Sequence, residues 1–311
     1  MGRRSRLRNA VEYGLAVLVL KSLEWAPLAL AHGMARGYAR LLDLAVPRLR
    51  QVALQNLSMA LPELSEARRS AIADGVFDSI ARMLVTFAKF PAIARDPLDR
   101  WVRVEGYEHV KQALQAGKGV LFATAHLGNW ELSAFVHARF AAPMHVVARP
   151  LDNPYLDRLV ERRRGLSGNR VILKQDSARA ILKALAANEA VGVLIDQNAA
   201  LESGVFVDFF GIPASANPGF AKLAAHSGAA VIPGFALWSS EERRYVLRFD
   251  APVPISGDAA RDTQALQARV EAAIRQYPDQ WLWIHRRWKT RPPGAPPLYQ
   301  AEPQKAGAGR R

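Results

Sequence analysis

Short apolar runs and amphipathic stretches alternate along the chain from about residue 119. The runs have the length of buried β-strands, and the stretches repeat apolar side chains at the three- and four-residue spacing of a helix. Strands are predicted at residues 119–125, 144–148, 170–173, 190–195, 229–237 and 245–249. Helices are predicted at residues 130–140, 157–164 and 178–187, after Pro218 as far as His226, and at residues 263–276. This alternation predicts an α/β fold with a mostly parallel sheet flanked by helices.

The part of the chain before residue 100 has helical patterns only. Residues 51–100 are predicted to form amphipathic helices that cover the sheet, with a break at Leu61-Pro62-Glu63. The segment 10–31 is more apolar but is interrupted by Glu12, Lys21, Glu24 and Pro27, and no small-residue cleavage site follows it. We expect residues 1–50 to be membrane-associated helices, residues 51–298 to be the α/β domain, and residues 299–311 to be a disordered basic tail.

Charge is concentrated at the two ends of the chain. The net charge is +14, and residues 1–50 and 285–311 are rich in arginine and lysine, whereas the middle is nearly neutral. Basic ends beside apolar helices favour an anionic membrane surface, because a nucleic-acid binder is expected to carry its basic stripe across the folded domain. Arginines flank the apolar segment 10–31 on both sides, which favours a helix in the cytoplasmic leaflet over a single crossing. An ordinary core helix is the alternative.

One motif joins a base to an acid at the end of a predicted strand. The run Gly119-Val-Leu-Phe-Ala-Thr-Ala125 leads directly into His126-Leu-Gly-Asn-Trp-Glu131. On a single helix His126 and Glu131 would point apart, so we expect the strand to end at His126, Gly128 to make a turn and Asn129 to cap the following helix. Glu131 then lies in the first helical turn, where it can face the imidazole, fix its tautomer and stabilise its protonated form. A satisfied structural histidine is the alternative, and it is preferred for most of the other histidines.

Two further polar groups follow predicted strands. Arg149 follows the strand 144–148 and Asp196 follows the strand 190–195, and strand ends of a parallel sheet meet at one edge. The sequence therefore predicts one crevice that contains His126, Arg149 and Asp196. Arg149 or Arg164, with backbone amides near Gly128, are candidate donors to an oxyanion, and either arginine is also a candidate for binding acceptor phosphate. Asp196 either orients an arginine, binds the acceptor or caps a loop.

Other candidates have a plain structural alternative. For Arg162, Arg163 and Arg164 a solvated helix face is predicted for at least two. Phe206, Phe209 and Phe210 are candidates to wall an acyl channel, although such a cluster is more often core. Tryptophans 281, 283 and 288 lie beside basic residues, and we expect Trp281 and Trp283 to be packed.

The H-x4-E motif resembles that of the glycerolipid acyltransferase superfamily, in which the histidine and the acidic residue activate a hydroxyl acceptor. Four other segments make the chain similar to the lipid A biosynthesis (lauroyl/myristoyl) acyltransferase branch, from about Asn56 to Pro293. They are Arg149-Pro150, Asp196-Gln197-Asn198, Gly204-Val-Phe-Val-Asp-Phe-Phe-Gly-Ile-Pro-Ala214 and Gln280-Trp-Leu-Trp-Ile-His-Arg-Arg-Trp-Lys-Thr-Arg-Pro292. Glu131 and the absence of a Glu-Gly-Thr-Arg block separate the chain from the phosphatidate-forming acyltransferases.

The resemblance implies transfer of a fatty acyl chain from acyl carrier protein or acyl-CoA to a hydroxyl of a lipid A precursor. Catalysis is expected from His126 and Glu131, with substrate or oxyanion binding by Arg149, Arg164, Asp196, Asn129 and Gly128. No cofactor and no metal are expected, and the location implied is the cytoplasmic side of the inner membrane. A phosphatidylinositol mannoside or other glycolipid acyltransferase fits the same motifs, and a basic membrane-surface adaptor is the non-enzymatic alternative.

Other enzyme classes lack their motifs in this sequence. No G-x-S-x-G nucleophile elbow and no H-E-x-x-H zinc motif is present. The chain has no cysteine, which excludes a disulfide framework and a thiolate nucleophile.

Overall fold

A seven-stranded sheet forms the centre of the computed structural model, which describes residues 5–175 and 177–300. The strands of this sheet are β1 (Val102–Glu105), β2 (Val120–Thr124), β3 (His145–Ala148), β4 (Arg170–Leu173), β5 (Ala190–Leu194), β8 (Ala230–Ser239) and β9 (Arg244–Phe249). Their order is β1-β9-β8-β2-β5-β3-β4, and only the β8–β9 pair is antiparallel. The predicted α/β fold with a mostly parallel sheet is confirmed. A separate antiparallel hairpin, β6 (Val205–Phe209) with β7 (Ile212–Ala216), was not expected from the sequence.

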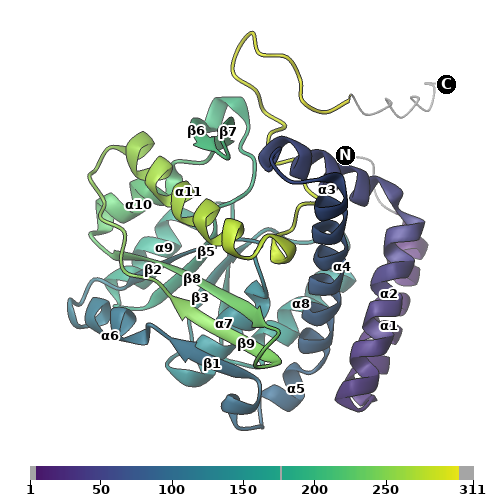
Figure 1. Ribbon diagram of the computed structural model, residues 1–311. Helices are drawn as coiled ribbons and strands as arrows, with labels where there is room; N and C mark the ends of the chain where they lie inside the picture. The colour runs from purple at the N-terminus through teal and green to yellow at the C-terminus, as the bar shows by residue number, and fades with distance from the viewer. Residues whose placement is uncertain (1–4, 176, 301–311) are drawn as a thin grey trace, which may run out of the picture.

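Helices lie on both faces of this sheet (Figure 1). They are α1 (Arg6–Trp25), α2 (Leu28–Ala45), α3 (Pro47–Ala60), α4 (Glu66–Ala88), α5 (Phe90–Ile93), α6 (Tyr107–Gln115), α7 (Trp130–Phe140), α8 (Pro154–Gly165), α9 (Ser177–Ala186), α10 (Gly219–Ser227) and α11 (Ala259–Gln276). Three short 3-10 turns, Leu98–Arg100, Leu201–Ser203 and Pro278–Gln280, join some of them.

The central strand β2 is buried on both faces, which explains its uninterrupted apolar sequence. Val120 and Phe122 pack in one core with residues of α5, α6 and α7. Leu121 and Ala123 pack in a second core with residues of α9, α10 and α11. The carboxyl end of β2 therefore has a fixed position between two packed layers, and His126 follows it directly.

The N-terminal helices pack on α4 through one face only. Leu20, Leu23, Ala31, Ala35 and Ala39 are buried against apolar residues of α4. Within the described part of the chain, none of the helices combines the length and the hydropathy that a membrane span requires. The outer face of α1 and α2 nevertheless exposes many leucines and a tryptophan.

The C-terminal segment returns to α3. Tyr299, the first residue of the predicted disordered tail, is buried, and its hydroxyl donates to the Asn56 side chain at 2.7 Å. Residues 301–311 of that predicted tail lie outside the described residues.

Candidate active site

The turn after β2 has the predicted form. Gly128 has a φ of +63°, and a Cβ at this position would lie 2.1 Å from the Ala236 carbonyl oxygen, so only glycine fits. Asn129 is the N-cap of α7, and its side chain accepts a hydrogen bond from the Leu132 amide at 3.0 Å. The first turn of α7, with Trp130 and Glu131, therefore faces the same cavity as His126.

The imidazole of His126 is oriented by Asp196. The His126 Nδ1 atom lies 2.9 Å from Asp196 Oδ1, and the His126 backbone amide donates to Asp196 Oδ2 at 2.9 Å. Trp281 Nε1 donates to the same Oδ2 atom at 2.8 Å. Asp196 is completely buried. Three donors thus hold one carboxylate beneath the ring, and the sequence predicted neither this role for Asp196 nor the part played by Trp281.

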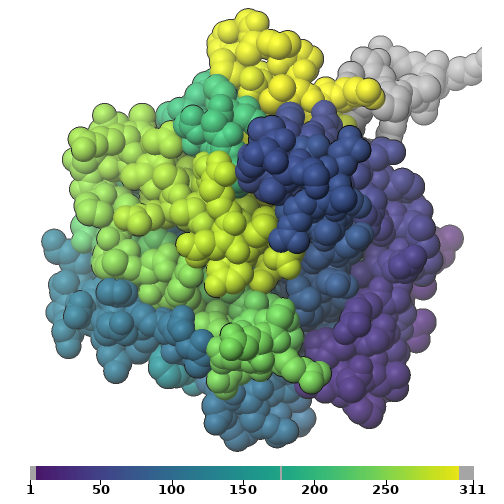
Figure 2. Space-filling model, in the orientation of Figure 1, coloured from purple at the N-terminus to yellow at the C-terminus, as the bar shows by residue number. Residues whose placement is uncertain are grey.

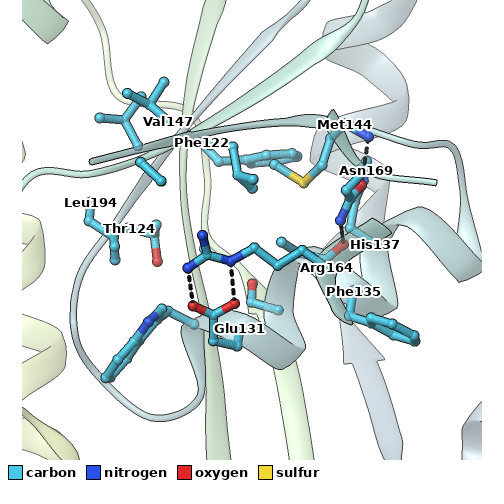
Figure 3. A pocket seen from close by; sticks show the side chains of 18 of the residues that line it. Phe122, Thr124, Glu131, Phe135, His137, Met144, Val147, Arg164, Asn169 and Leu194 are labelled. Carbon is cyan, nitrogen blue, oxygen red and sulfur yellow. Dashed lines mark hydrogen bonds and ion pairs between the residues drawn. The ribbon is translucent and has the colours of Figure 1, made fainter. Parts of the chain in front are cut away.

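Glu131 has a different partner from the one predicted. Both of its oxygens bind Arg164 of α8, with distances of 2.9 Å to Nε and 2.5 Å to Nη2 (Figure 3). The expectation that Glu131 orients the His126 ring is therefore wrong. A planar guanidinium matches both carboxylate oxygens at once, and that geometry saturates Glu131 and turns it toward α8. Its charge still acts on His126 across the cavity.

The ionisation of the His126–Asp196 pair follows from its surroundings. Burial favours a neutral ring, but the charge of Asp196, its hydrogen bond to the ring and the charge of Glu131 together hold the pKa of His126 above its ordinary value. Burial likewise opposes the Asp196 charge, yet His126, His285 and the Trp281 hydrogen bond hold the pKa of that carboxyl far below its usual range. A charged Asp196 accepts a hydrogen bond from the Nδ1–H group of His126, which places the lone pair of the ring on Nε2. This atom lies 3.4 Å from the side-chain nitrogen of Gln197 at the cavity and can act as a base.

A cavity of about 370 Å³ opens beside His126. Its polar part contains His126, Glu131, Arg149, Arg164 and Gln197, which come from the ends of β2, β3 and β5 and from α7 and α8. Its inner part lies between the sheet and α7 and is mostly apolar, although His137 and Asn169 also line it (Figure 3). The buried apolar side chains that line the inner part are Phe90, Phe122, Phe135, Met144 and Phe249.

The predicted convergence at the strand ends is confirmed for His126 and Arg149, which line one cavity, whereas Asp196 lies beneath His126 and does not line it. His126 and Asp196 are in direct contact, whereas Arg149 lines the rim of the cavity. The Arg149 side chain is 68% exposed and pairs with Asp152 at 3.2 Å. It therefore borders the site without touching the buried pair.

Gly128 and Asn129 have structural roles. The Gly128 amide donates to the Gln280 carbonyl at 2.9 Å, and the Asn129 amide donates to the Ala236 carbonyl at 2.8 Å. Because these amides already have acceptors, the expectation that they bind an oxyanion is wrong. Asn129 is also completely buried and is not among the residues that line the cavity.

The aromatic cluster after residue 205 is core and does not wall the channel. Phe209 and Phe210 are buried against Trp281, Trp283 and Trp288. Phe206 is partly exposed and lies away from the cavity. The expected packing of Trp281 and Trp283 is confirmed, because both are fully buried.

Arg163 and Arg164 do not lie on a solvated face. Arg163 is buried, with its guanidinium bonded to the Ala88 carbonyl and to the carboxylate of Glu24. Arg164 binds Glu131 in the cavity. Only Arg162 of the three is exposed, so the expectation for at least two of them is wrong.

Comparison with known proteins gives a consistent result. The model of a family described as bacterial lipid A biosynthesis acyltransferase matches residues 1–290. The chain is 29% identical to a lipid A biosynthesis lauroyltransferase of Escherichia coli over 288 residues, which cover 92% of this chain and 94% of that protein. It is 25% identical to a lipid A biosynthesis acyltransferase of Haemophilus influenzae over 90% of this chain and 88% of that one. An E. coli lipid A biosynthesis myristoyltransferase is 25% identical over 79% of this chain and 76% of its own length.

Proposed function

Because the chain belongs to the bacterial lipid A biosynthesis acyltransferase family, we propose that it transfers one fatty acyl chain from a thioester donor to a hydroxyl of a lipid A precursor. The chain is an acyltransferase, and membership of the family supports acyl transfer in lipid A biosynthesis. The donor that we propose is an acyl carrier protein thioester, with acyl-CoA as the second candidate. The buried Asp196–His126 pair beside an apolar cavity is the observation that supports this chemistry most directly.

The proton transfer that we propose uses Nε2 of His126. This atom takes the proton of the acceptor hydroxyl while the oxygen attacks the thioester carbonyl carbon. When the tetrahedral intermediate collapses, the carbon–sulfur bond breaks and the imidazolium returns its proton to the leaving thiolate. Asp196 stabilises the imidazolium between these two steps. The charges of Asp196 and Glu131 raise the pKa of His126, which makes the ring a stronger base toward the acceptor hydroxyl.

The acyl chain is proposed to lie in the inner, apolar part of the cavity. Phe122 and Met144 lie beyond the Glu131–Arg164 pair in the close view (Figure 3). A fatty chain in this position places its carbonyl near His126 at the polar mouth. Arg164 pairs with Glu131, which largely compensates the positive charge of the guanidinium. We therefore propose that Arg164 mainly holds Glu131 in position. Its Nη1 atom, which Glu131 does not use, is the proposed donor to the developing oxyanion.

We further propose that α1 rests on the cytoplasmic face of the inner membrane. Exposed apolar side chains recur along one face of α1 at helical spacing: Leu7, Val11, Leu15, Leu18 and Trp25. The same helix is fastened to α8 by the ion pair of Glu24 with Arg163 and by the bond from Asn153 to the Asn9 carbonyl. Since α8 also carries Arg164, the helix with the apolar stripe is bonded directly to a helix that forms part of the cavity wall.

A direct assay tests the enzymatic proposal. Purified protein is incubated with a lipid A precursor in detergent micelles and with acyl carrier protein thioester or acyl-CoA, and the product is detected by mass spectrometry. We expect addition of one acyl chain, and we expect His126→Ala to abolish it while the protein stays folded and membrane-bound. Full activity of His126→Ala would refute the catalytic assignment. Unchanged lipid A in cells that lack the protein would refute the acceptor.

A further inference from the structure

Three arginines from three separate elements gather around the ring of His32 in α2. Arg36 lies one helical turn further along α2, Arg82 belongs to α4, and Arg243 stands in the loop that joins β8 to β9. Burial and the charges of these three arginines lower the pKa of His32, and no carboxylate among the described residues offsets them at the ring. We call these four residues the arginine cluster. It brings together positive charges that are far apart in the sequence.

The ring of Trp238 in β8 lies against two members of the arginine cluster. Its centre is 6.4 Å from the centre of the His32 ring and 5.5 Å from the guanidinium carbon of Arg82. The Gln280 side chain fixes Trp238 by accepting from its backbone amide at 2.8 Å and donating to its carbonyl at 3.0 Å. This part of the cluster is therefore formed before any ligand binds, which lowers the entropic cost of binding.

The three arginines of the cluster have no ion-pair partner among the described residues. Glu242 lies in the same loop between β8 and β9, but Arg103 and Arg244 bind this carboxylate. Arg82 lies beside the buried hydroxyl of Tyr245, whose pKa burial raises to about 12, so this neighbour is neutral. The buried Nε atom of Arg82 has no hydrogen-bond acceptor within the described part of the chain. The charge of the cluster is thus uncompensated, which favours an anionic ligand.

The arginine cluster borders the exposed apolar surface where α1 meets α2. Trp25 at the end of α1 is 77% exposed, and Leu28 at the start of α2 is 45% exposed. Leu28, His32 and Arg36 follow one another at four-residue spacing, so they share one face of α2. Figure 2 shows the tip of the β8–β9 hairpin, in green, beside the purple surface of these two helices. A lipid chain on the apolar surface would therefore place its head group near Arg36 and Arg243.

We propose that the arginine cluster binds the phosphate of an anionic phospholipid in the membrane. This site goes beyond acyl transfer, and it rests only on the membrane contact proposed above for α1. A guanidinium presents two parallel N–H groups to phosphate oxygens, so the arginines can bind several oxygens of one head group. Trp238 suits this place because indole rings favour the level of the head groups. The apolar stripe alone leaves the protein free to turn about the axis of α1, and a second contact fixes its orientation.

Binding to vesicles tests the proposal with a double variant that removes two of the charges. Phosphatidylcholine vesicles with and without phosphatidylglycerol are sedimented with the wild type and with the variant Arg36→Gln, Arg243→Gln. The control, Arg40→Gln with Arg269→Gln, loses the same charge from exposed arginines outside the cluster. We expect the cluster variant to bind the phosphatidylglycerol vesicles about tenfold more weakly than the control does. Equal weakening by the two variants would show a general attraction of charge and would overturn the proposal.

A soluble lipid separates the site from the membrane contact and from catalysis. Short-chain phosphatidylglycerol, below its micellar concentration, is added to the full chain, and the His32 ring is followed by NMR through a pH titration. A phosphate beside the ring favours its charged form, so the lipid should raise the pKa of His32 in the wild type but not in Arg36→Gln, Arg243→Gln.

Two results of this titration would overturn the proposal. They are an unchanged pKa of His32 with the lipid, and an equal rise with inorganic phosphate at the same concentration, which would assign the site to free phosphate. If the wild type transfers no acyl chain but shows the rise that depends on the lipid, the proposed function fails and the arginine cluster stands.

Discussion

Replacing Asp196 with asparagine is expected to reverse the tautomer of His126 while keeping the local structure. Asp196 Oδ2 accepts from two fixed donors, the His126 amide and Trp281 Nε1, so the amide oxygen of asparagine has to occupy that position. The amide nitrogen then replaces Oδ1 and donates to His126 Nδ1. All three hydrogen bonds are kept, but the ring proton moves to Nε2. The atom that faces the acceptor becomes a donor and cannot act as a base.

The expected cost is large because the wrong tautomer has no base at the reacting position. Where a buried aspartate orients a catalytic histidine, replacing that aspartate with asparagine lowers kcat about 10⁴-fold. At about 1.4 kcal/mol for each factor of ten, this loss corresponds to about 5.5 kcal/mol of transition-state stabilisation. Asp196 also loses its charge in the variant, so the imidazolium intermediate is destabilised in addition. We therefore expect kcat to fall by at least three orders of magnitude, with the acceptor KM nearly unchanged.

The assay is steady-state acyl transfer from a thioester donor to the lipid A precursor, with circular dichroism and thermal melting of each variant. Asp74→Asn is the control, because this aspartate is 64% exposed and its ion pair with Arg50 is expected to contribute little. Retention of more than a tenth of the wild-type kcat by a folded Asp196→Asn protein would refute the assignment of Asp196 as the orienting residue. Loss of the cooperative melt would show that the carboxylate is needed for folding, and the milder Trp281→Phe variant would then test the orientation.

Four further outcomes follow from the geometry. Glu131→Gln removes a negative charge that raises the pKa of His126, so the acidic limb of the plot of kcat/KM against pH should move to lower pH. An unchanged acidic limb would contradict the electrostatic role of Glu131. Burial lowers the pKa of His137 to about 4, so the unfolded chain binds a proton before the folded protein does as the pH falls below 6.5. The free energy of unfolding should therefore fall by about 3 kcal/mol between pH 6.5 and pH 4. Urea titrations of His137→Gln at several pH values should lack this pH dependence. Met144→Ala enlarges the apolar end of the cavity, so in a competition between donors the variant should prefer longer acyl chains than the wild type does. An unaltered distribution of products would show that the acyl chain lies elsewhere. The double variant Leu18→Glu, Trp25→Ser should sediment less with anionic vesicles than the wild type, and Leu201→Ser, an exposed leucine outside α1, is the control. Equal binding by all variants would exclude α1 as the part of the protein that contacts the membrane.

The central strands of the fold were predictable because they are largely buried on both faces. In β2 and β5 nearly every side chain is apolar, and such runs are recognisable without knowledge of their neighbours. β1 and the β6–β7 hairpin were not predicted. β1 mixes Val102 and Val104 with Arg103 and Glu105, because it lies at the edge of the sheet and is only partly buried. A four-residue strand in which charged and apolar side chains alternate leaves too weak a pattern for recognition from sequence, whereas the equally short edge strand β4 was recognised by its run Val171-Ile172-Leu173.

The N-terminal segment shows why an apolar helix is ambiguous in sequence. The helices α1 and α2 bury one stripe against α4, as an ordinary core helix does, and expose leucines on the other. The periodicity of apolar residues in the sequence indicates both apolar faces, but it does not show which face packs against the rest of the protein. Glu24, which weakens the segment as a membrane span, is used inside the protein, where it pairs with Arg163. Such partners lie more than one hundred residues apart and cannot be inferred from local spacing.

The assignment of Asp196 and Glu131 depends on which strands are neighbours, and the sequence does not encode that order in any local pattern. β2 pairs with β5 in a parallel register that sets Thr124 beside Leu194. Two residues further along both strands, His126 stands beside Asp196, so the register alone brings imidazole and carboxylate together. Glu131 lies nearer to His126 in the chain, but the start of α7 turns it toward α8, where Arg164 takes both of its oxygens. A carboxylate that is already paired in two places is a poor partner for a ring that needs a strong acceptor, whereas the fully buried Asp196 has no cation other than His126 within hydrogen-bonding distance among the described residues. The H-x4-E spacing therefore marks the mouth of the cavity, and the carboxylate that orients the His126 ring follows the neighbouring strand β5.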